Sequence, residues 1–573
     1  MITVLSSLYR ISSSNSRALR VGVLADAGSI PQLFLSIFED IAKCNFARLE
    51  VVVRMQGPAA SRRAGVLFRL YDRWDRMRAN AAADPFAPAE AADAFGAARR
   101  IDAEVSADGE IGSDALEAIR AADLDVLLLV SCRDIRGRIV QIPRHGVWAY
   151  RFADGPERDG ALALFWQVRY ARPFTRVALC VLGDAGKNDR VLCEGVFGGA
   201  PAGNISWRAG RARPGWACTS FVIQKLFELH SCGAVRSSEP PSRNAPAAHG
   251  RNPSNTEMIA WLAPKIAGKV ARRLVTGARA EHWRMAIRVG EQRLLRSGVP
   301  DTSGFRWISS PPGHLYADPF LIRREGQIWL FYEHYEYAAR RAVIDCAAVL
   351  PDGALSEARV ALRRNYHLSF PQVFEYGGEI FMVPETGGNR TVELYRAVHF
   401  PHEWKLEKVL ASNLWAVDTA IWHDGEFWWF FSTLKESRAE GTMLFLFFSR
   451  ELTGEWKSHP ANPICADVRT VRGAGPIFRQ DGRLLRPSQD GSVRYGYRLN
   501  FQEITTLNPE EYCEQALLTL DPTTWEGLVG LHTYSQCAGA EAIDGCTLAT
   551  AAETGGYTSA VIAPKNVEAA ALI

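Results

Sequence analysis

The chain has 573 residues, too many for a single hydrophobic core, so two or three domains are expected. Its 66 Lys and Arg residues nearly balance its 63 Asp and Glu residues, and the formal net charge is +3. This balance supplies no general field for nucleic acid or anionic lipid, so we expect no nucleic-acid partner.

Eleven cysteines are scattered singly between Cys44 and Cys546, without a C-x-x-C pair or a Cys/His cluster at zinc spacing. This usage is typical of reduced thiols in the cytoplasm, and we predict no metal site and no cofactor, although the sequence leaves open whether a metal such as calcium occupies the channel of the second domain. Residues 1–20 lack the apolar region of a signal peptide, and no stretch approaches 18 apolar residues. We therefore expect a cytoplasmic protein without a transmembrane segment; peripheral membrane association and the oligomeric state stay open.

Residues 1–231 alternate short apolar runs with helical stretches, which is typical of an α/β layer fold with a mainly parallel sheet. Helices are expected over residues 31–43 and 115–122. Strands are expected over residues 20–25, 49–54, 124–130, 146–150 and 176–182. The pattern predicts a Rossmann-type first domain.

Residues 232–256 are small, polar and proline-rich, and bury too little apolar surface to order themselves, so we predict a disordered linker. The apolar residues that follow recur at helical spacing: Ile259, Leu262, Ile266, Val270 and Leu274. We expect this helix to run to Glu281, within a helical connector over residues 257–300.

Residues 301–550 repeat one hairpin pattern, in which a short strand meets a glycine turn and is answered by a second strand, usually rich in aromatic residues, that ends in a polar residue. The four copies are residues 318–322 with 329–333, 370–374 with 380–385, 418–422 with 427–432, and 475–478 with 484–488. Their turn glycines, Gly326, Gly378, Gly425 and Gly482, lie 52, 47 and 57 residues apart, about one propeller blade. With a fifth blade from residues 525–548, this predicts an all-β five-bladed propeller before a C-terminal tail at residues 551–573.

In a propeller the first strand of each blade lines the central channel, so equivalent positions converge on the axis. Asp318 and Asp418 hold that position in the first and third copies, and Gln372 in the second. The fourth copy offers only Ala474-Gly475, and Asp544 is the candidate from the fifth blade.

A ring of carboxylates is what glycosidic chemistry requires, because one group protonates the leaving oxygen and another acts as base or nucleophile. We predict Asp318, Glu385 and Asp418 as catalytic residues of an axial pocket. The predicted substrate-binding residues are His314, Tyr316, Glu333, Gln372, Trp415, Arg486, Asp490 and His532. For Asp318 and Asp418 a structural role in an Asx-type turn is an equal alternative.

These stretches resemble the N-terminal domain of the glucosamine inositolphosphorylceramide transferase family, a five-bladed propeller similar to glycoside hydrolases of families 43 and 32. The resemblance covers residues 305–550 and is carried by residues 314–320, 369–372, 384–386, 415–419 and 486–490. It implies a carbohydrate-directed domain. Family 43 hydrolases place acids on the inner strands of the first three blades, whereas here the second blade offers Gln372 and the third offers Asp418 in place of Glu.

The first domain resembles the N-terminal fold of formyltransferases, in which an Asn-x-His motif follows a strand. In residues 145–152, Ala149 stands where that motif has Asn and Arg151 where it has His. Alanine cannot donate to an oxyanion and arginine is no general base, so the resemblance implies a degenerate domain without formyltransferase activity.

Three hypotheses follow. The first is a carbohydrate-active protein of glycan or glycoconjugate metabolism, a glycosyl hydrolase or transferase that acts through the axial carboxylates on a glycan or a sugar-containing small molecule. In the second, the propeller is a glycan-binding or interaction module without chemistry. The third is formyl or acyl transfer to an amino sugar by the first domain, which predicts folate binding.

Overall fold

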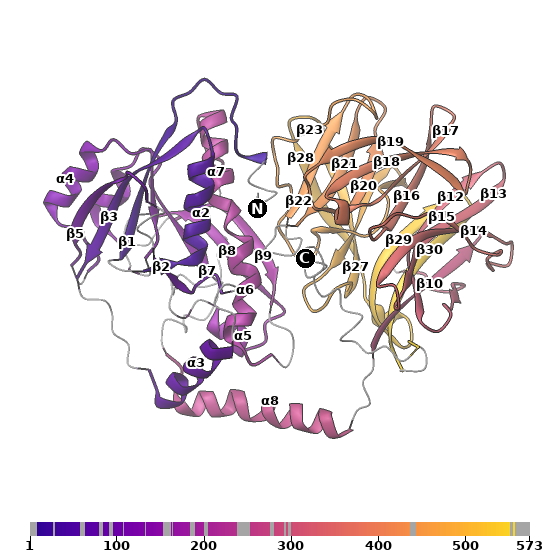
Figure 1. The fold of residues 1–573 in the computed structure, drawn as a ribbon, viewed down its shortest axis with the longest axis horizontal. Helices are drawn as coiled ribbons and strands as arrows, with labels where there is room; N and C mark the ends of the chain where they lie inside the picture. The colour runs from indigo at the N-terminus through magenta and orange to yellow at the C-terminus, as the bar shows by residue number, and fades with distance from the viewer. Residues whose placement is uncertain are drawn as a thin grey trace. The chain divides into compact units, whose positions relative to one another are not determined.

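The computed structural model divides the chain into two compact units, one built mainly from residues 1–273 and one from residues 274–435 and 441–573 (Figure 1). It describes residues 8–26, 29–57, 64–78, 84–90, 95–106, 108–131, 133, 135–152, 162, 164–183, 189–199, 204–237, 252–275, 280–291, 294–295, 300–435, 443–550 and 554–555. Among the described helices, none is long and apolar enough to cross a membrane.

The first unit is built on a seven-stranded sheet in the order β5-β3-β1-β6-β7-β8-β9. The strands are β1 (Leu19–Asp26), β3 (Ala47–Gln56), β5 (Arg99–Glu104), β6 (Val126–Leu129), β7 (Val147–Phe152), β8 (Phe174–Val181) and β9 (Arg190–Gly198). The strands from β5 to β7 are parallel, and β8 is antiparallel to both of its neighbours. The predicted α/β fold with a mainly parallel sheet is confirmed, whereas the likeness to formyltransferases stays a prediction.

Helices cover both faces of this sheet. On β7, Ala149 belongs to a core cluster with Ile119 of α4, whereas the ring of Tyr150 lies 6.1 Å from Phe34 of α2 and 6.4 Å from Phe221 of α7. Successive strand residues point to opposite faces, so α4 lies on one side and α2 and α7 on the other. The helices of the unit are α2 (Gln32–Lys43), α3 (Val66–Arg78), α4 (Ser113–Ala121), α5 (Phe165–Arg169), α6 (Trp207–Ala217), α7 (Ser220–Cys232) and α8 (Asn255–Val275).

Short elements complete the first unit. They are the two-stranded pair β2 (Ile30–Pro31) and β4 (Pro88–Ala89) and the 3-10 helix η2 (Gly137–Gln141). Of the predicted linker, residues 238–251 lie outside the described residues, as do residues 551–553 and 556–573 of the predicted tail.

The second unit is the predicted five-bladed propeller, and each blade is an antiparallel sheet. Blades 1 to 4 are β12–β15 (His314–Arg324, Gln327–Glu336, Arg341–Val349, Arg359–Leu362), β16–β19 (Ser369–Tyr376, Glu379–Glu385, Thr391–His399, Glu403–Ser412), β20–β23 (Ala416–His423, Trp428–Leu434, Met443–Ser449, Lys457–Ser458) and β24–β28 (Arg472–Gly473, Phe478–Gln480, Arg483–Asp490, Arg498–Leu507, Tyr512–Leu520). Blades 2 and 5 also adjoin the 3-10 helices η4 (Gly387–Asn389) and η5 (Pro522–Thr524).

The fifth blade combines two distant parts of the chain. Its order is β11-β10-β30-β29, with β29 (Leu528–Cys537) and β30 (Ala540–Ala549) from the C-terminal part and β10 (Ala280–Val289) and β11 (Arg306–Ile308) from before blade 1. The predicted helix therefore ends at Val275 rather than Glu281, and the predicted helical connector over residues 257–300 contains a strand of the propeller. Residues 280–289 form a strand because they pair with β30 from Ala280–Ala549 to Val289–Ala540.

Deleting β10 is expected to unfold the propeller. A chain beginning at residue 301 loses the buried side chains of Trp283, Met285 and Ile287 and leaves β30 as an open edge. Burial of each such side chain is worth about 1.5–3 kcal/mol, so the total approaches the whole stability of a typical domain. Circular-dichroism melting of residues 301–573 and 274–573 checks this: only the longer chain is expected to melt cooperatively. Equal melting of both would contradict the closure by β10.

Candidate active site

The innermost strands share one irregularity. Pairing with the second strand of the blade skips two residues in blades 1, 2, 3 and 5, namely Asp318-Pro319, Phe370-Pro371, Asp418-Thr419 and His532-Thr533. The first three bulges begin with a left-handed residue, with φ of 50°, 47° and 49° at Asp318, Phe370 and Asp418. Such bulges take the backbone N–H out of the ladder, and it needs another acceptor.

Carboxylates from neighbouring blades supply these acceptors. The Asp318 N–H donates to Asp544 Oδ2 at 3.0 Å, the Phe370 N–H to Asp318 Oδ2 at 3.1 Å, and the Asp418 N–H to Glu385 Oε2 at 3.1 Å. The bulges of blades 1, 2 and 3 are thus each held by an acid of the preceding blade, counting blade 5 as preceding blade 1, whereas the bulge of blade 5 is held by Asp544 of the same blade. The acids therefore stabilise the contacts between blades and also gather at the axis.

Between blades 1 and 5 the cluster centres on His532. Its Nδ1 lies 2.5 Å from Asp544 Oδ2 and its Nε2 lies 3.5 Å from Asp318 Oδ1, while the Thr533 hydroxyl donates to Asp318 Oδ1 at 2.6 Å. Burial opposes the charged imidazole, but the carboxylates of Asp544 and Asp318 outweigh it and raise the pKa of His532 to about 9. At neutral pH His532 is therefore an imidazolium between two acids.

These three residues are also the candidate metal ligands among the residues that the structure describes. One ligand atom each from Asp318, His532 and Asp544 lies within 4.8 Å of the others. The 2.5 Å contact between His532 and Asp544 is the geometry of a charge-assisted hydrogen bond, which a metal on His532 Nδ1 would replace. The predicted absence of a metal stays a prediction.

Blade 4 contributes a cation that the sequence did not reveal. Arg472 approaches Asp418 Oδ2 with Nε at 2.7 Å and Nη2 at 2.6 Å, and its guanidinium lies 4.9 Å from the ring centre of Tyr495. The Tyr495 ring in turn contacts His532 at 5.4 Å, and Trp283 of β10 stacks on His532 at 4.2 Å. The prediction that blade 4 brings almost nothing to the axis is therefore wrong.

Glu333 and Glu385 occupy equivalent places in blades 1 and 2. Each stands on the second strand opposite the residue before the bulge, Glu333 opposite Ala317 and Glu385 opposite Ser369. The Glu333 side chain is 12% exposed and its Oε1 lies 3.3 Å from His367 Nε2. Glu385 is half-buried, whereas Asp318, Asp418 and Asp544 are buried. Glu333 and Glu385 are therefore the acids of the cluster that solvent reaches.

The acids raise one another's proton affinity. Burial raises the pKa of Glu333 well above its ordinary value, and the carboxylates of Asp318 and Glu385 raise it further. Burial also raises the pKa of Asp318 to about 6, although the charge of His532 lowers it. The pKa of Asp418 is likewise raised by burial to about 6, although the charge of Arg472 lowers it. Burial lowers the pKa of His367 to about 4, so this neighbour of Glu333 is a neutral imidazole. The site therefore holds protonated and ionised acids side by side.

The structure brings the predicted catalytic residues Asp318, Glu385 and Asp418 together with Glu333 and His532, but places the other predicted residues elsewhere. The bulge position in blade 2 belongs to Phe370, and Gln372 is buried beside it. The Gln372 side chain exchanges two 2.8 Å hydrogen bonds with the backbone of Ile421 and joins blades 2 and 3. Asp544, which was predicted on the innermost strand of blade 5, lies on the second strand. His532 occupies the innermost strand instead.

The remaining predicted binding residues have local partners. His314 Nδ1 lies 2.9 Å from His334 Nε2, and Tyr316 packs at the contact of blade 1 with β10. Trp415 lies between the cations of Arg390 and Lys435, at 5.3 and 5.6 Å.

Two further predicted residues serve blade 4. The buried Arg486 donates to both oxygens of Glu514, at 2.8 and 2.7 Å, and Asp490 Oδ1 accepts from the Ser492 N–H at 2.8 Å. Both side chains therefore stabilise the blade and its following turn rather than joining the acidic cluster.

In the first unit, the positions aligned with the formyltransferase motif carry different chemistry. Ala149 is buried in the core, and Arg151 is ion-paired with the buried Asp189, which also accepts from the Gly183 N–H at 2.8 Å. These residues supply a buried ion pair in place of a general base.

Residues 306–524 match the family described as glucosamine inositolphosphorylceramide transferase 1, N-terminal. The chain is 37% identical over 215 residues to the Arabidopsis thaliana protein glucosamine inositolphosphorylceramide transferase 1, and 35% identical over 226 residues to the protein of that name from Oryza sativa subsp. japonica. These alignments cover 36% and 39% of this chain but only 28% and 29% of the plant proteins. The predicted resemblance of the propeller is confirmed.

Solved structures of glycoside hydrolases are among those that align with part of the chain, and two examples follow. They are a family 117 glycoside hydrolase from Zobellia galactanivorans (12% identity, TM-score 0.31, 47% of this chain and 91% of that one) and a family 43 β-xylosidase/α-arabinofuranosidase from a compost metagenome (12%, 0.30, 38% and 81%). At these scores they add no argument, and the propeller follows from its strand order.

Proposed function

We propose that the axial acidic cluster, defined as Asp318, Glu333, Glu385, Asp418 and Asp544, is a carbohydrate site that cleaves or transfers a glycosyl group. The observation that carries this proposal is that Glu333, whose pKa is raised well above its ordinary value, and the half-buried Glu385 occupy equivalent positions on adjacent blades. Glycosidic chemistry needs one carboxyl group that donates a proton to the leaving oxygen and a second that acts as base or nucleophile. The names of the plant relatives support a carbohydrate-related substrate.

The roles follow from the contacts. Glu333 keeps its proton because its neighbours are acids and a neutral imidazole, so it is the candidate proton donor to a leaving oxygen. The Asp418 N–H donates to Glu385 Oε2 and holds this carboxyl group against blade 3, and Glu385 is the candidate base or nucleophile. Asp318, Asp418 and Asp544 hold the bulges and balance the charges of His532 and Arg472.

The second candidate is a glycan-binding module without chemistry, favoured by the half-exposed ring of Tyr495 beside Arg472. Sugar rings stack on such faces, and binding needs no protonated acid.

A glycan array of the full chain, followed by mass spectrometry of the bound glycans, separates the two. We expect Glu385→Gln to bind the same glycans as the native chain and to abolish their cleavage or transfer. Binding without turnover by the native chain would favour the binding module, and no binding by either chain would overturn both.

A further inference from the structure

We propose that the outer faces of α3 and α8 dock the first unit onto an anionic lipid bilayer, independently of the propeller chemistry. The two helices form one body. The Leu67 N–H of α3 donates to Asn255 Oδ1 at the start of α8 at 3.0 Å, and the rings of Tyr71 and Trp261 meet at 5.2 Å. Their outward sides therefore form one surface, which we call the α3/α8 face.

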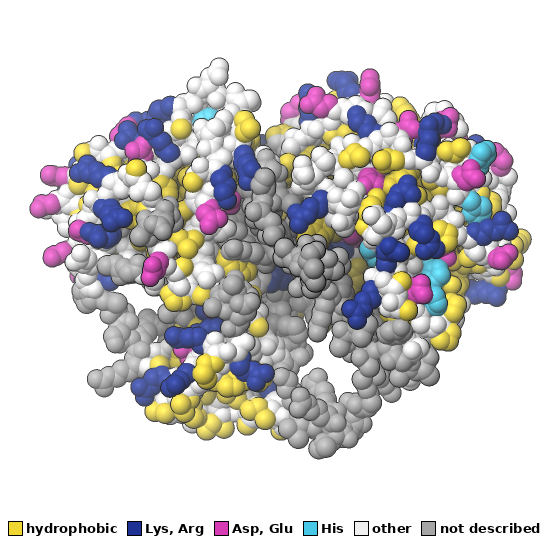
Figure 2. Space-filling model, viewed as in Figure 1, with side chains coloured by type: hydrophobic (Ala, Val, Ile, Leu, Met, Phe, Trp, Pro, Cys, Tyr) yellow, Lys and Arg dark blue, Asp and Glu magenta, His cyan; other side chains and the backbone are white. Residues whose placement is uncertain are grey.

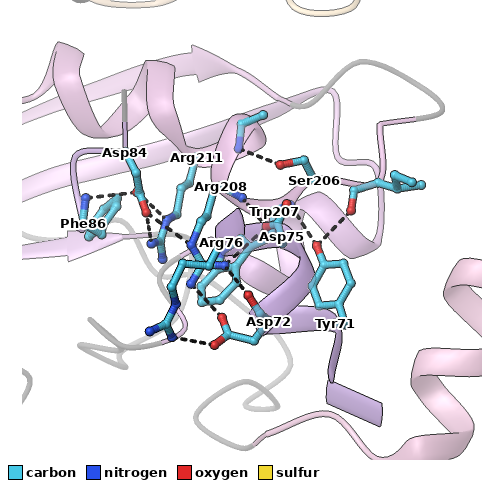
Figure 3. A network of polar contacts seen from close by, with 12 residues as sticks. Tyr71, Asp72, Asp75, Arg76, Asp84, Phe86, Ser206, Trp207, Arg208 and Arg211 are labelled. Atoms are coloured by element: carbon cyan, nitrogen blue, oxygen red, sulfur yellow. Dashed lines mark hydrogen bonds and ion pairs between the residues drawn. The ribbon is translucent and has the colours of Figure 1, made fainter. Parts of the chain in front are cut away.

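The two acidic residues of α3 are both bound by Arg208 of α6. Asp72 Oδ1 lies 2.7 Å from Arg208 Nη2, and the wholly buried Asp75 accepts from the Arg208 N–H at 3.0 Å (Figure 3). Arg211 is held in turn by Asp84, at 2.6 and 2.9 Å. This network fixes α3 on α6, and Asp72 also uses its Oδ2 to pair with the exposed Arg76 at 2.8 Å, so one of the outer arginines of α3 has an acidic partner.

What remains outside on α3 is basic and apolar. The exposed positions of this helix are Val66, Arg69, Leu70, Arg73, Arg76, Met77 and Arg78. Leu70 is 60% and Met77 70% exposed, which is unusual for large apolar side chains on a well-packed helix. Four arginines interleave with three apolar residues, without an acid among the exposed positions of α3.

The outer side of α8 is apolar over residues 259–267. Its inner side packs through Met258 and Trp261, which are buried. The exposed positions from residue 259 to residue 267 are Ile259, Ala260, Ala263, Pro264, Ile266 and Ala267. Figure 2 shows apolar side chains in yellow beside basic ones in dark blue over this part of the first unit.

The arginines of the α3/α8 face are complementary in charge to an anionic bilayer surface. An apolar stripe bordered by arginines is the pattern of helices that lie in the plane of a membrane interface, with the apolar side chains among the acyl chains and the cations at the headgroups. The net charge of +3 for the whole chain does not show this patch, in which four exposed arginines of α3 adjoin one partly exposed acid, Asp72. Near an anionic surface each arginine raises the partition coefficient about fivefold.

Co-sedimentation of the full chain with vesicles of phosphatidylcholine, with and without phosphatidylglycerol, tests the proposal. We expect at least about tenfold stronger binding to the anionic vesicles, which weakens at high salt. The combined change Leu70→Ser, Met77→Ser, Ile259→Ser and Ile266→Ser is expected to lower binding about tenfold or more. A second variant, Arg69→Gln with Arg73→Gln, is expected to lower binding to anionic vesicles alone.

The matched control is Val398→Ser with Leu406→Ser, which removes side chains 50% and 48% exposed on blade 2 and is expected to change nothing. Thermal melting shows whether each variant stays folded. The proposal is overturned if the native chain does not bind anionic vesicles. The same holds if the blade 2 control lowers binding as much as the fourfold serine variant does. It is also overturned if light scattering shows that the serine variant only converts a dimer to a monomer, because the face would then contact a second copy.

Discussion

Replacing Glu333 by Gln is expected to lower the turnover number about 10²- to 10⁴-fold with little change in KM, because the variant keeps the shape of the site but cannot release a proton. The measurement uses a glycan that the array identifies as a substrate. Substrates whose leaving group needs no protonation, such as activated aryl glycosides, should lose much less activity. Glu336→Gln, an exposed position on the same strand β13, is the matched control and should retain native activity.

The pH dependence gives an independent check of this role. Activity of the native chain should fall at high pH as Glu333 ionises, and the raised pKa of Glu333 moves this alkaline limb well above the ordinary range of a carboxyl group. The Gln variant should lack the limb. An unchanged alkaline limb in the variant would assign the proton donor to another residue.

The hairpins of blades 1 to 4 could be predicted from the sequence because their signals are local. Turn glycines such as Gly326 and Gly482 have positive φ, of 83° and 79°, where glycine is favoured, and short apolar runs flank them on both sides. The fifth blade could not be predicted in this way. Its central pairing joins Ala280 to Ala549, and nothing near residue 280 signals a partner so distant in the chain.

The site was partly predictable for a similar reason. The aligned repeats place Asp318 and Asp418 at the axis, as the structure does, but Gln372 was predicted as the axial residue of blade 2, where the structure has the backbone N–H of Phe370. Arg472 was missed because its partner Asp418 lies in another blade, 54 residues away. Ion pairs between blades leave no local pattern, whereas a strand and its turn do.

Asp544→Asn is expected to have the largest effect on the stability of the propeller. Its Oδ1 accepts from the His532 and Thr533 N–H groups at 3.2 and 2.8 Å, and its Oδ2 from the Asp318 N–H at 3.0 Å and from His532 Nδ1 at 2.5 Å. An amide would turn a donor toward two of these donors and leave the imidazolium without its nearest counter-charge. Loss of one partner of a buried pair costs about 3–5 kcal/mol. Calorimetry should show the propeller transition about 6–20 °C lower.

Asp352→Asn is the matched control, since its carboxylate is 65% exposed and pairs with the exposed Arg306. An exposed pair is worth at most about 1 kcal/mol, so this variant should melt close to the native chain. Equal melting of the two variants would mean that the Asp544 contacts do not hold blade 5 against blade 1.

The native propeller should also lose stability as pH rises from 6.5 to 9. The pKa of His532 is raised from 6.5 to about 9 in the folded chain, so its contribution is fully present below pH 6.5 and disappears as the imidazolium loses its proton near pH 9. The loss amounts to about 3 kcal/mol. The pKa of Asp318, about 6, lies below this window. In Asp544→Asn the main source of the raised pKa of His532 is gone, so the free energy of unfolding should fall less steeply between pH 6.5 and 9 than in the native chain, whereas the raised pKa of Glu333 contributes a loss to both chains. An equally steep loss in the variant would place the proton on another group.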